Sequence, residues 1–288
     1  MKLAIMGLGV RLFSIVAVGI LAATVTHAQM GGGRSSATPI QGSTDQQQTE
    51  MHMLTDVQTQ SGIRLNPKEE AAYKAFYAVN SELPDKKIQL GLDFLQKYPT
   101  SILTEPVEVG LINAYYAKQD WTDFYASVDK ALALKPDDVD VLTTVGWVIP
   151  HIYNPSDPDA DQKLDKAETY EKHAIDVIGI MPKPAYLTDA QFAASKRQKF
   201  IQAHSALGLV YFRREDYEKS ARELQQFALA GGSPDQTDLY VLGIDLQNLK
   251  RYGEAADAFN NCGQISGGLQ DRCKQSADAA KKSDMATK

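Results

Sequence analysis

The chain has 288 residues, of which 43% are apolar and 23% are charged, and its formal net charge is -6 at pH 7. This length and apolar content suffice for one large or two ordinary globular domains with a sizeable core. A mildly acidic chain without a basic stripe argues against nucleic acid as the main partner, because phosphate binding needs a basic face.

The first 28 residues have the pattern of a secretory signal. Lys2 and Arg11 give a positive start, residues 12–24 form an apolar run, and Thr26 and Ala28 are small residues where a signal peptidase reads. The apolar run is shorter than the roughly 20 residues that span a bilayer. We therefore expect cleavage after Ala28 and a periplasmic or secreted protein with no integral membrane domain. An uncleaved N-terminal anchor is the alternative.

Residues 29–66 form the next segment, which is rich in Gly, Ser and Gln, as in 31–33 and 46–48. Apolar residues are sparse and without period there, so little surface can be buried to offset the entropy of ordering the chain. We expect a disordered leader that acts as a tether.

From Pro67 to the end of the sequence, apolar residues recur at helical spacing, with short breaks at Pro or Gly. No stretch shows sustained alternation of β-branched residues, as half-buried strands would. The fold class predicted for residues 67–288 is all-α.

Self-similarity organises this region. Segments 205–230 and 240–262 align so that Gly208 matches Gly243, 35 residues later, and Tyr217 matches Tyr252. Weaker copies of the same helix pair lie upstream. Their first and second helices are expected at 69–80 with 84–99, at 106–119 with 120–136, and at 141–151 with 164–180.

This pattern resembles the tetratricopeptide repeat (TPR), with a large residue and Gly in the first helix and a Tyr opening the second. The resemblance implies an α-solenoid, a right-handed superhelix of about five antiparallel helix pairs, closed by a capping helix at about 269–283. Small residues such as Gly146, Gly208 and Gly243 would let the paired helices approach closely.

Two departures from the regular period are visible. The third pair carries an insert at 154–158, and the first helix of the fourth pair is lengthened, starting near Thr188. Thr188 followed by Gln191 fits a capping box.

The segment FLQKYPTS (94–101) is also similar to a phrase in periplasmic TPR proteins, such as the TPR lipoprotein of the outer-membrane β-barrel assembly machine. This similarity implies an alternative function as an outer-membrane assembly or cell-wall biogenesis factor. The missing cysteine near the cleavage site counts against a lipid anchor of that kind.

The concave face of a TPR stack is lined mainly by the first helices, and aromatic residues with Arg are common interface anchors. The expected partner-binding residues are Asn113, Tyr116, Trp147, Phe212, Arg213 and Tyr240. The alternative for Trp147 and Phe212 is packing against the next helix. A carboxylate clamp is not expected, because Val109 stands where the clamp needs Lys.

The insert contains five acids at the ligand spacing of an EF-hand-like loop, and such oxygens can bind Ca²⁺. They are Asp157, Asp159, Asp161, Asp165 and Glu168. Gln162 replaces the Gly of the sharp turn, and the last two acids also suit the first turn of a helix. We expect a solvated acidic loop and no metal or other cofactor, with calcium as the alternative.

Cys262 and Cys273 are expected at a buried position of the last pair and on the capping helix above it. Because export would place them in an oxidising compartment, we expect a disulfide between them that holds the capping helix; two buried thiols are the alternative.

The sequence carries no H-E-x-x-H, no G-x-S-x-G and no phosphate-cradling Gly loop between a strand and a helix. The expected function is a non-enzymatic scaffold in the cell envelope that binds a peptide or helix of another protein on its concave face.

Overall fold

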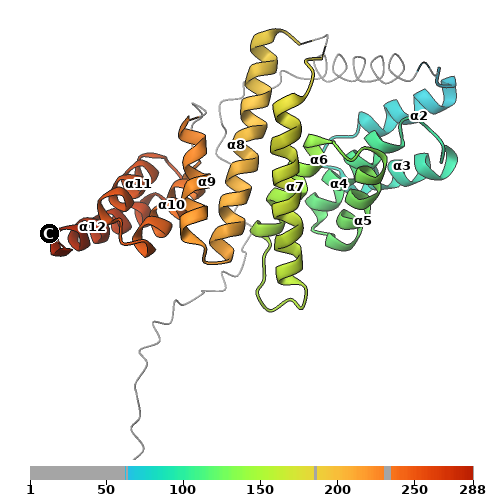
Figure 1. Cartoon of the computed structure of the whole chain (residues 1–288). Coiled ribbons are helices and arrows are strands. Elements are labelled where there is room, and N and C mark those ends of the chain that lie inside the picture. The colour runs from blue at the N-terminus through green and yellow to red at the C-terminus, as the bar shows by residue number, and fades with distance from the viewer. Residues whose placement is uncertain (1–61, 63, 185–186, 230–234, 288) are drawn as a thin grey trace, which may run out of the picture. The chain divides into compact units, whose positions relative to one another are not determined.

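The computed structural model describes residues 62, 64–184, 187–229 and 235–287, and within them there are eleven helices and no strand (Figure 1). The helices are α2 (Pro67–Tyr77), α3 (Pro84–Lys97), α4 (Thr104–Lys118), α5 (Trp121–Leu134), α6 (Val139–His151), α7 (Ala160–Ile180), α8 (Asp189–Arg213), α9 (Tyr217–Leu229), α10 (Gln236–Asn248), α11 (Tyr252–Gln264) and α12 (Gln270–Thr287). The all-α prediction is confirmed over these residues. The expected signal peptide and most of the expected leader lie outside them.

Short polar residues or prolines start several of the helices. The Asn66 side chain accepts a hydrogen bond from the backbone of Glu69 ahead of Pro67, and Asp120 caps α5 in the same way. Such caps satisfy backbone N–H groups that the first helical turn leaves open. At α8, Thr188 and Gln191 form the reciprocal bonds of a capping box, as the sequence predicted.

Consecutive helices lie side by side along the described chain. Close pairs are formed by α4 with α5, α6 with α7, α8 with α9, and α10 with α11, and α12 packs on α11. The first helices also touch one another across pairs, since α8 contacts both α6 and α10. Each pair can therefore bury an apolar face that it could not bury alone.

The same turn joins three of these pairs. Gln119, Glu215 and Lys250 have left-handed backbones with φ of 58°, 59° and 60°. In each turn the next N–H reaches back five residues, as where Asp216 donates to the Tyr211 carbonyl at 3.0 Å. This is the Schellman motif, which satisfies carbonyls at a helix end and reverses the chain. The third pair has instead the expected insert, because α6 ends at His151 and α7 begins at Ala160.

A glycine brings the helices of a pair together. A Cβ atom at Gly208 would lie 2.5 Å from the side chain of Leu224, and one at Gly243 would lie 2.5 Å from the ring of Phe259. In both pairs the large residue follows the glycine by 16 positions. At Gly146 in α6 a Cβ would collide with the carboxyl group of Glu171.

The long helix α8 has apolar neighbours on two sides. Val210 belongs to a buried cluster formed by residues of α2 to α7, whereas the adjacent Leu209 belongs to a second cluster formed with α9 to α12. In a helix, successive side chains point about 100° apart, so neighbouring residues can serve different cores. The packed helices thus share α8 as a common wall.

Candidate binding site

Two of the expected partner-binding residues lie on α4. Asn113 is exposed, and Tyr116 is 39% exposed, which is unusual for a large aromatic residue in this protein. The ring centroid of Tyr116 lies 6.0 Å from that of Trp121 at the start of α5, in an edge-to-face arrangement. Tyr116 is thus available at the surface while one edge is held by its neighbour.

Two further expected residues contact the C-terminal part of α6. Trp147 is half-buried, and its ring stacks on His151 with centroids 3.8 Å apart. Arg213 of α8 donates a hydrogen bond to the Pro150 carbonyl at 3.1 Å, and its guanidinium carbon lies 5.7 Å from the ring centre of Tyr153. Arg213 therefore links α8 to the last turn of α6 and to Tyr153, which follows it.

Phe212 and Tyr240 are half-buried, and part of each ring contacts neighbouring side chains. The centroid of Phe212 lies 6.4 Å from that of Tyr217, and that of Tyr240 lies 5.6 Å from that of Phe259. Arg272 lies over the Tyr240 ring at 5.4 Å. These contacts match the packing alternative for Phe212 and give Tyr240 an internal partner.

A pocket of about 270 Å³ opens between α5, α6 and α7. We call it the α5–α7 pocket. Aromatic and aliphatic side chains form most of its wall, and polar groups of the insert and of α7 complete it. Its lining is Trp121, Tyr125, Ile149, Ile152, Tyr153, Asn154, Asp157, Ala160 and Lys163.

The α5–α7 pocket connects two of the expected residues. Trp121, which lines it, contacts Tyr116, and Tyr153, which also lines it, carries Arg213 over its ring. The exposed ring of Tyr116 and the guanidinium of Arg213 therefore each contact a residue of the pocket wall.

The insert that closes the pocket is held by its own polar groups. The Asn154 amide donates to Asp157 at 2.9 Å, and Lys163 binds Asp157 at 3.4 Å and Asp159 at 3.0 Å. The Ala160 backbone N–H also donates to the Asp157 carbonyl at 3.1 Å. Asp157 is thus fixed from three directions, which keeps this side of the pocket in one shape.

One group in the wall is left without a partner. The hydroxyl oxygen of Tyr125 is buried and makes no hydrogen bond to any part of the chain that the structure describes. Burial raises the pKa of this hydroxyl. The positive charge of Lys163 lowers it, and the negative charges of Asp159 and Asp157 raise it further. The group stays a neutral donor and acceptor, and leaving it unpaired costs free energy.

The sequence reasoning missed these pocket residues, apart from Asp157. Trp121 and Tyr125 belong to the second helix of a pair, which the expected TPR stack would place away from its concave face. The available signal was the insert itself, since residues added between paired helices must fold over the end of a neighbouring helix.

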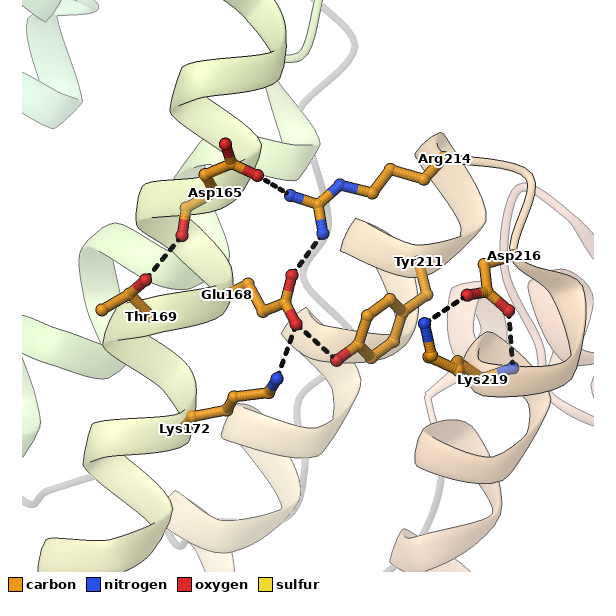
Figure 2. A network of polar contacts seen from close by, with 8 residues as sticks. All are labelled: Asp165, Glu168, Thr169, Lys172, Tyr211, Arg214, Asp216 and Lys219. Atoms are coloured by element: carbon orange, nitrogen blue, oxygen red, sulfur yellow. Dashed lines mark hydrogen bonds and ion pairs between the residues drawn. The ribbon is translucent and has the colours of Figure 1, made fainter.

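A polar network joins α7 to α8 beyond the insert (Figure 2). Arg214 binds both Asp165 and Glu168, and Glu168 also accepts from Tyr211 at 2.8 Å and from Lys172 at 2.6 Å. Burial alone would raise the pKa of Glu168, but the hydrogen bonds from Lys172, Arg214 and Tyr211 lower it to about 2. Glu168 is therefore ionised, and its carboxylate links the two helices.

The structure does not assemble the calcium site considered for the acidic loop. Asp157 and Asp159 bind Lys163, and Glu168 binds Arg214 one turn or more further along α7. Asp165 also binds Arg214, and Asp161 is exposed. Over the described residues, no three His, Cys, Asp or Glu side chains gather in a way that could hold a metal ion. Protein cations compensate most of these charges instead.

Cys262 on α11 and Cys273 on α12 are fully buried and lie at disulfide distance, with Cα atoms 5.7 Å apart. The distance falls in the usual range for a disulfide. The expected proximity of α12 to the last pair is confirmed, and α12 extends to Thr287 rather than ending near 283.

None of the described helices has both the length and the apolar character needed to cross a membrane. In comparisons with known proteins, no family model matches the chain, and no curated protein matches it significantly. The function must therefore be argued from this chain's own residues.

Proposed function

We propose that this chain is a TPR-type, non-enzymatic scaffold that acts in the cell envelope and binds another protein. Three observations support the architecture: the contacts between successive helix pairs, the turn that recurs at Gln119, Glu215 and Lys250, and the glycine that faces a large side chain 16 positions later. The signal-like first 28 residues support export.

The observation that carries the binding role is the surface at the ends of α4, α6 and α8. Tyr116 and Arg213 are exposed there, and Trp147 is half-exposed. Aromatic residues and Arg are the side chains that most often dominate protein interfaces. Tyr116 and Arg213 each contact a residue that lines the α5–α7 pocket, so a partner that covers this surface would have both large side chains and a recess to bind.

The binding role is tested by affinity purification of the tagged chain from cross-linked envelopes. We expect one partner to be captured by the native protein and lost with Tyr116→Ala/Arg213→Ala. The matched control is Arg222→Ala, which removes an exposed Arg of α9. Circular dichroism must show native helix content, because Arg213 also bonds the Pro150 carbonyl.

Two outcomes would count against the proposal. If the double variant captures the partner as well as the native protein, this surface is not the binding site. If the native protein captures no partner, the scaffold role itself fails.

A further inference from the structure

Two adjacent arginines stand at the C-terminal end of α8, and their surroundings differ in charge. Arg214 binds the carboxylates of Asp165 and Glu168 on α7. Arg213 instead contacts the backbone carbonyl of Pro150 and the ring of Tyr153. Within the residues that the structure describes, it forms no ion pair with an acid. The first arginine of the pair thus has an uncompensated positive charge.

The guanidinium of Arg213 is nevertheless held in position. Its Nε–H donates to the Pro150 carbonyl at 3.1 Å, and its central carbon lies 5.7 Å from the ring centre of Tyr153. A guanidinium carries its N–H donors in one rigid plane, so fixing Nε also fixes the two terminal nitrogens. No acceptor among the described residues takes a hydrogen bond from these terminal nitrogens. They form an oriented fork that is open to an outside acceptor.

The pKa of Arg213 reflects the missing acid. Burial lowers the pKa of this guanidinium, while the interaction with Tyr153 raises it. At Arg251 the pKa is raised, first of all by the hydrogen bond with Glu254. A partly desolvated cation without an acidic partner costs free energy, and a carboxylate bound beside it would reduce that cost.

The neighbouring His151 leaves this charge uncompensated. Its Nδ1 lies 2.6 Å from the Trp147 carbonyl, which can only accept, so Nδ1 carries a hydrogen. Burial lowers the pKa of His151, the Trp147 carbonyl and the charge of Asp235 raise it, and the charge of Arg213 lowers it. Because the net shift is downward, His151 is neutral at pH 7. Asp235 caps α10 by accepting from the backbone N–H of Asp238 at 2.8 Å.

We propose that Arg213 binds an acidic side chain, Asp or Glu, of the partner, with its terminal nitrogens donating to the two carboxylate oxygens. This inference rests on the proposed function and specifies what the partner presents. Bidentate pairs of this kind are stronger than neutral hydrogen bonds and fix the geometry of the partner. One positive charge matches one carboxylate, whereas a phosphate group, with about two negative charges, would keep an excess. The half-buried Trp147, stacked on His151, offers apolar surface next to the acid.

The probe for this inference is a phage-displayed library of random peptides, selected on the purified chain. The peptides are fused to the coat protein through their C-termini, so only side chains can supply a carboxylate. The selection is repeated on Arg213→Gln and on the matched control Arg222→Gln, which removes an exposed Arg of α9. We expect a position enriched in Asp or Glu with the native chain and the control, and no such enrichment with Arg213→Gln.

A selected peptide then supports a double-mutant cycle. Its enriched acid is replaced by the corresponding amide, and dissociation constants are measured by fluorescence anisotropy. On the native chain this change should weaken binding about tenfold to a hundredfold, as expected for a hydrogen bond between charged groups. On Arg213→Gln the same change should have almost no effect, because the acid has already lost its partner. Arg213→Lys, which keeps the charge without the fork, should give an intermediate loss.

Three outcomes would overturn the inference: no peptide is selected, the selected peptides share no acidic position, or the amide weakens binding equally on the native chain and on Arg213→Gln. Circular dichroism checks that the variants fold. If Arg213→Gln does not fold, the native chain still decides, because equal affinity for the acidic and the amide peptide contradicts the proposal. These measurements use the purified chain alone. If they fail while a partner is still captured from envelopes, the scaffold role stands and only the acidic contact is lost.

Discussion

In the fourth and fifth helix pairs, a glycine of the first helix faces a large apolar side chain of the second, whereas in the third pair Gly146 faces Glu171. Glu171 is fully buried, and both carboxyl oxygens lack a hydrogen-bond partner in the described structure. Burial raises the pKa of Glu171 well above its ordinary value. The third pair thus keeps the close approach but fills it with an acid.

The buried acids of the fifth pair differ from Glu171, because each accepts a hydrogen bond from a serine. Ser220 of α9 donates to Asp245 at 2.5 Å, and Ser205 of α8 donates to Asp238 at 2.7 Å. The third pair also carries the insert and the α5–α7 pocket. The third pair thus holds a buried acid without a partner in the described structure, whereas the buried acids of the later pairs accept hydrogen bonds from serines.

The largest effect that we predict is on the pH dependence of stability. Burial raises the pKa of Asp245 to about 7, although the hydrogen bond from Ser220 opposes this rise. The raised pKa means that the native state holds the proton more tightly. The stability that Asp245 contributes is therefore complete below about pH 4 and is lost as pH rises to about 7.

The loss attributable to Asp245 should be on the order of 4 kcal/mol across that interval. Asp245→Asn should flatten the curve of unfolding free energy against pH by this amount, while the amide oxygen still accepts from Ser220. Urea unfolding at a series of pH values measures both curves. Parallel curves for native and variant would show that Asp245 does not titrate during unfolding in this range.

Disturbing the contact between Gly243 and Phe259 should have the next largest effect on stability. In Gly243→Ala the new Cβ would lie 2.5 Å from the Phe259 ring, which is held inside the core. Overpacking of this kind should destabilise the protein by about 2 to 3 kcal/mol. The control is Gly179→Ala in α7, where a Cβ would meet no atom within 4 Å. It should stabilise slightly, since Ala favours helix. Equal effects of both changes in thermal unfolding would contradict the close contact.

Replacing Glu171 of the third pair by an apolar residue should have a smaller effect on stability, of opposite sign. Glu171→Leu removes a buried acid that has no partner in the described residues. We expect the free energy of unfolding to rise by about 2 kcal/mol at neutral pH, because an unpaired buried polar group costs about that much. Glu171→Gln is the control, since it keeps the shape and the unpaired polar atoms. Destabilisation by Leu would mean that the carboxyl group has a partner.

A substitution in the recurrent left-handed turn should have the smallest effect on stability. Lys250 has φ of 60°, a conformation that costs residues with a side chain about 1 kcal/mol and costs Gly almost nothing. Lys250→Gly should therefore raise stability by up to about 1 kcal/mol. Tyr153→Gly, in the segment between α6 and α7 and not in such a turn, should not stabilise. A loss of stability in Lys250→Gly would show that this turn is not left-handed.

The sequence was sufficient for the helices and insufficient for the pocket. Caps such as Thr188 with Gln191, and helix starts such as Pro84, are local signals, and each predicted a boundary within a few residues. The 16-residue spacing of the glycine contact is also local to one pair. In the third pair the insert lengthens that spacing to the 25 residues between Gly146 and Glu171, which hid the acid that faces the glycine.

The pocket depends on how the insert folds back over α5, and no periodicity encodes that path. Among its lining residues, Tyr125 looks from the sequence like an ordinary aromatic position of a second helix. Only the placement of Asp157 and Lys163 beside it shows that its hydroxyl is enclosed. The candidate site was therefore predictable as a region, through Tyr116 and Arg213, and not as a recess.

The central claim is that a partner protein binds at the ends of α4, α6 and α8, beside the pocket. The most direct measurement is cross-linking mass spectrometry on the native chain in cells, which locates the lysines joined to the partner. We predict cross-links from Lys118, at the end of α4, and from Lys163, in the pocket wall. Cross-links confined to exposed lysines of α12, such as Lys274 and Lys281, would contradict the claim.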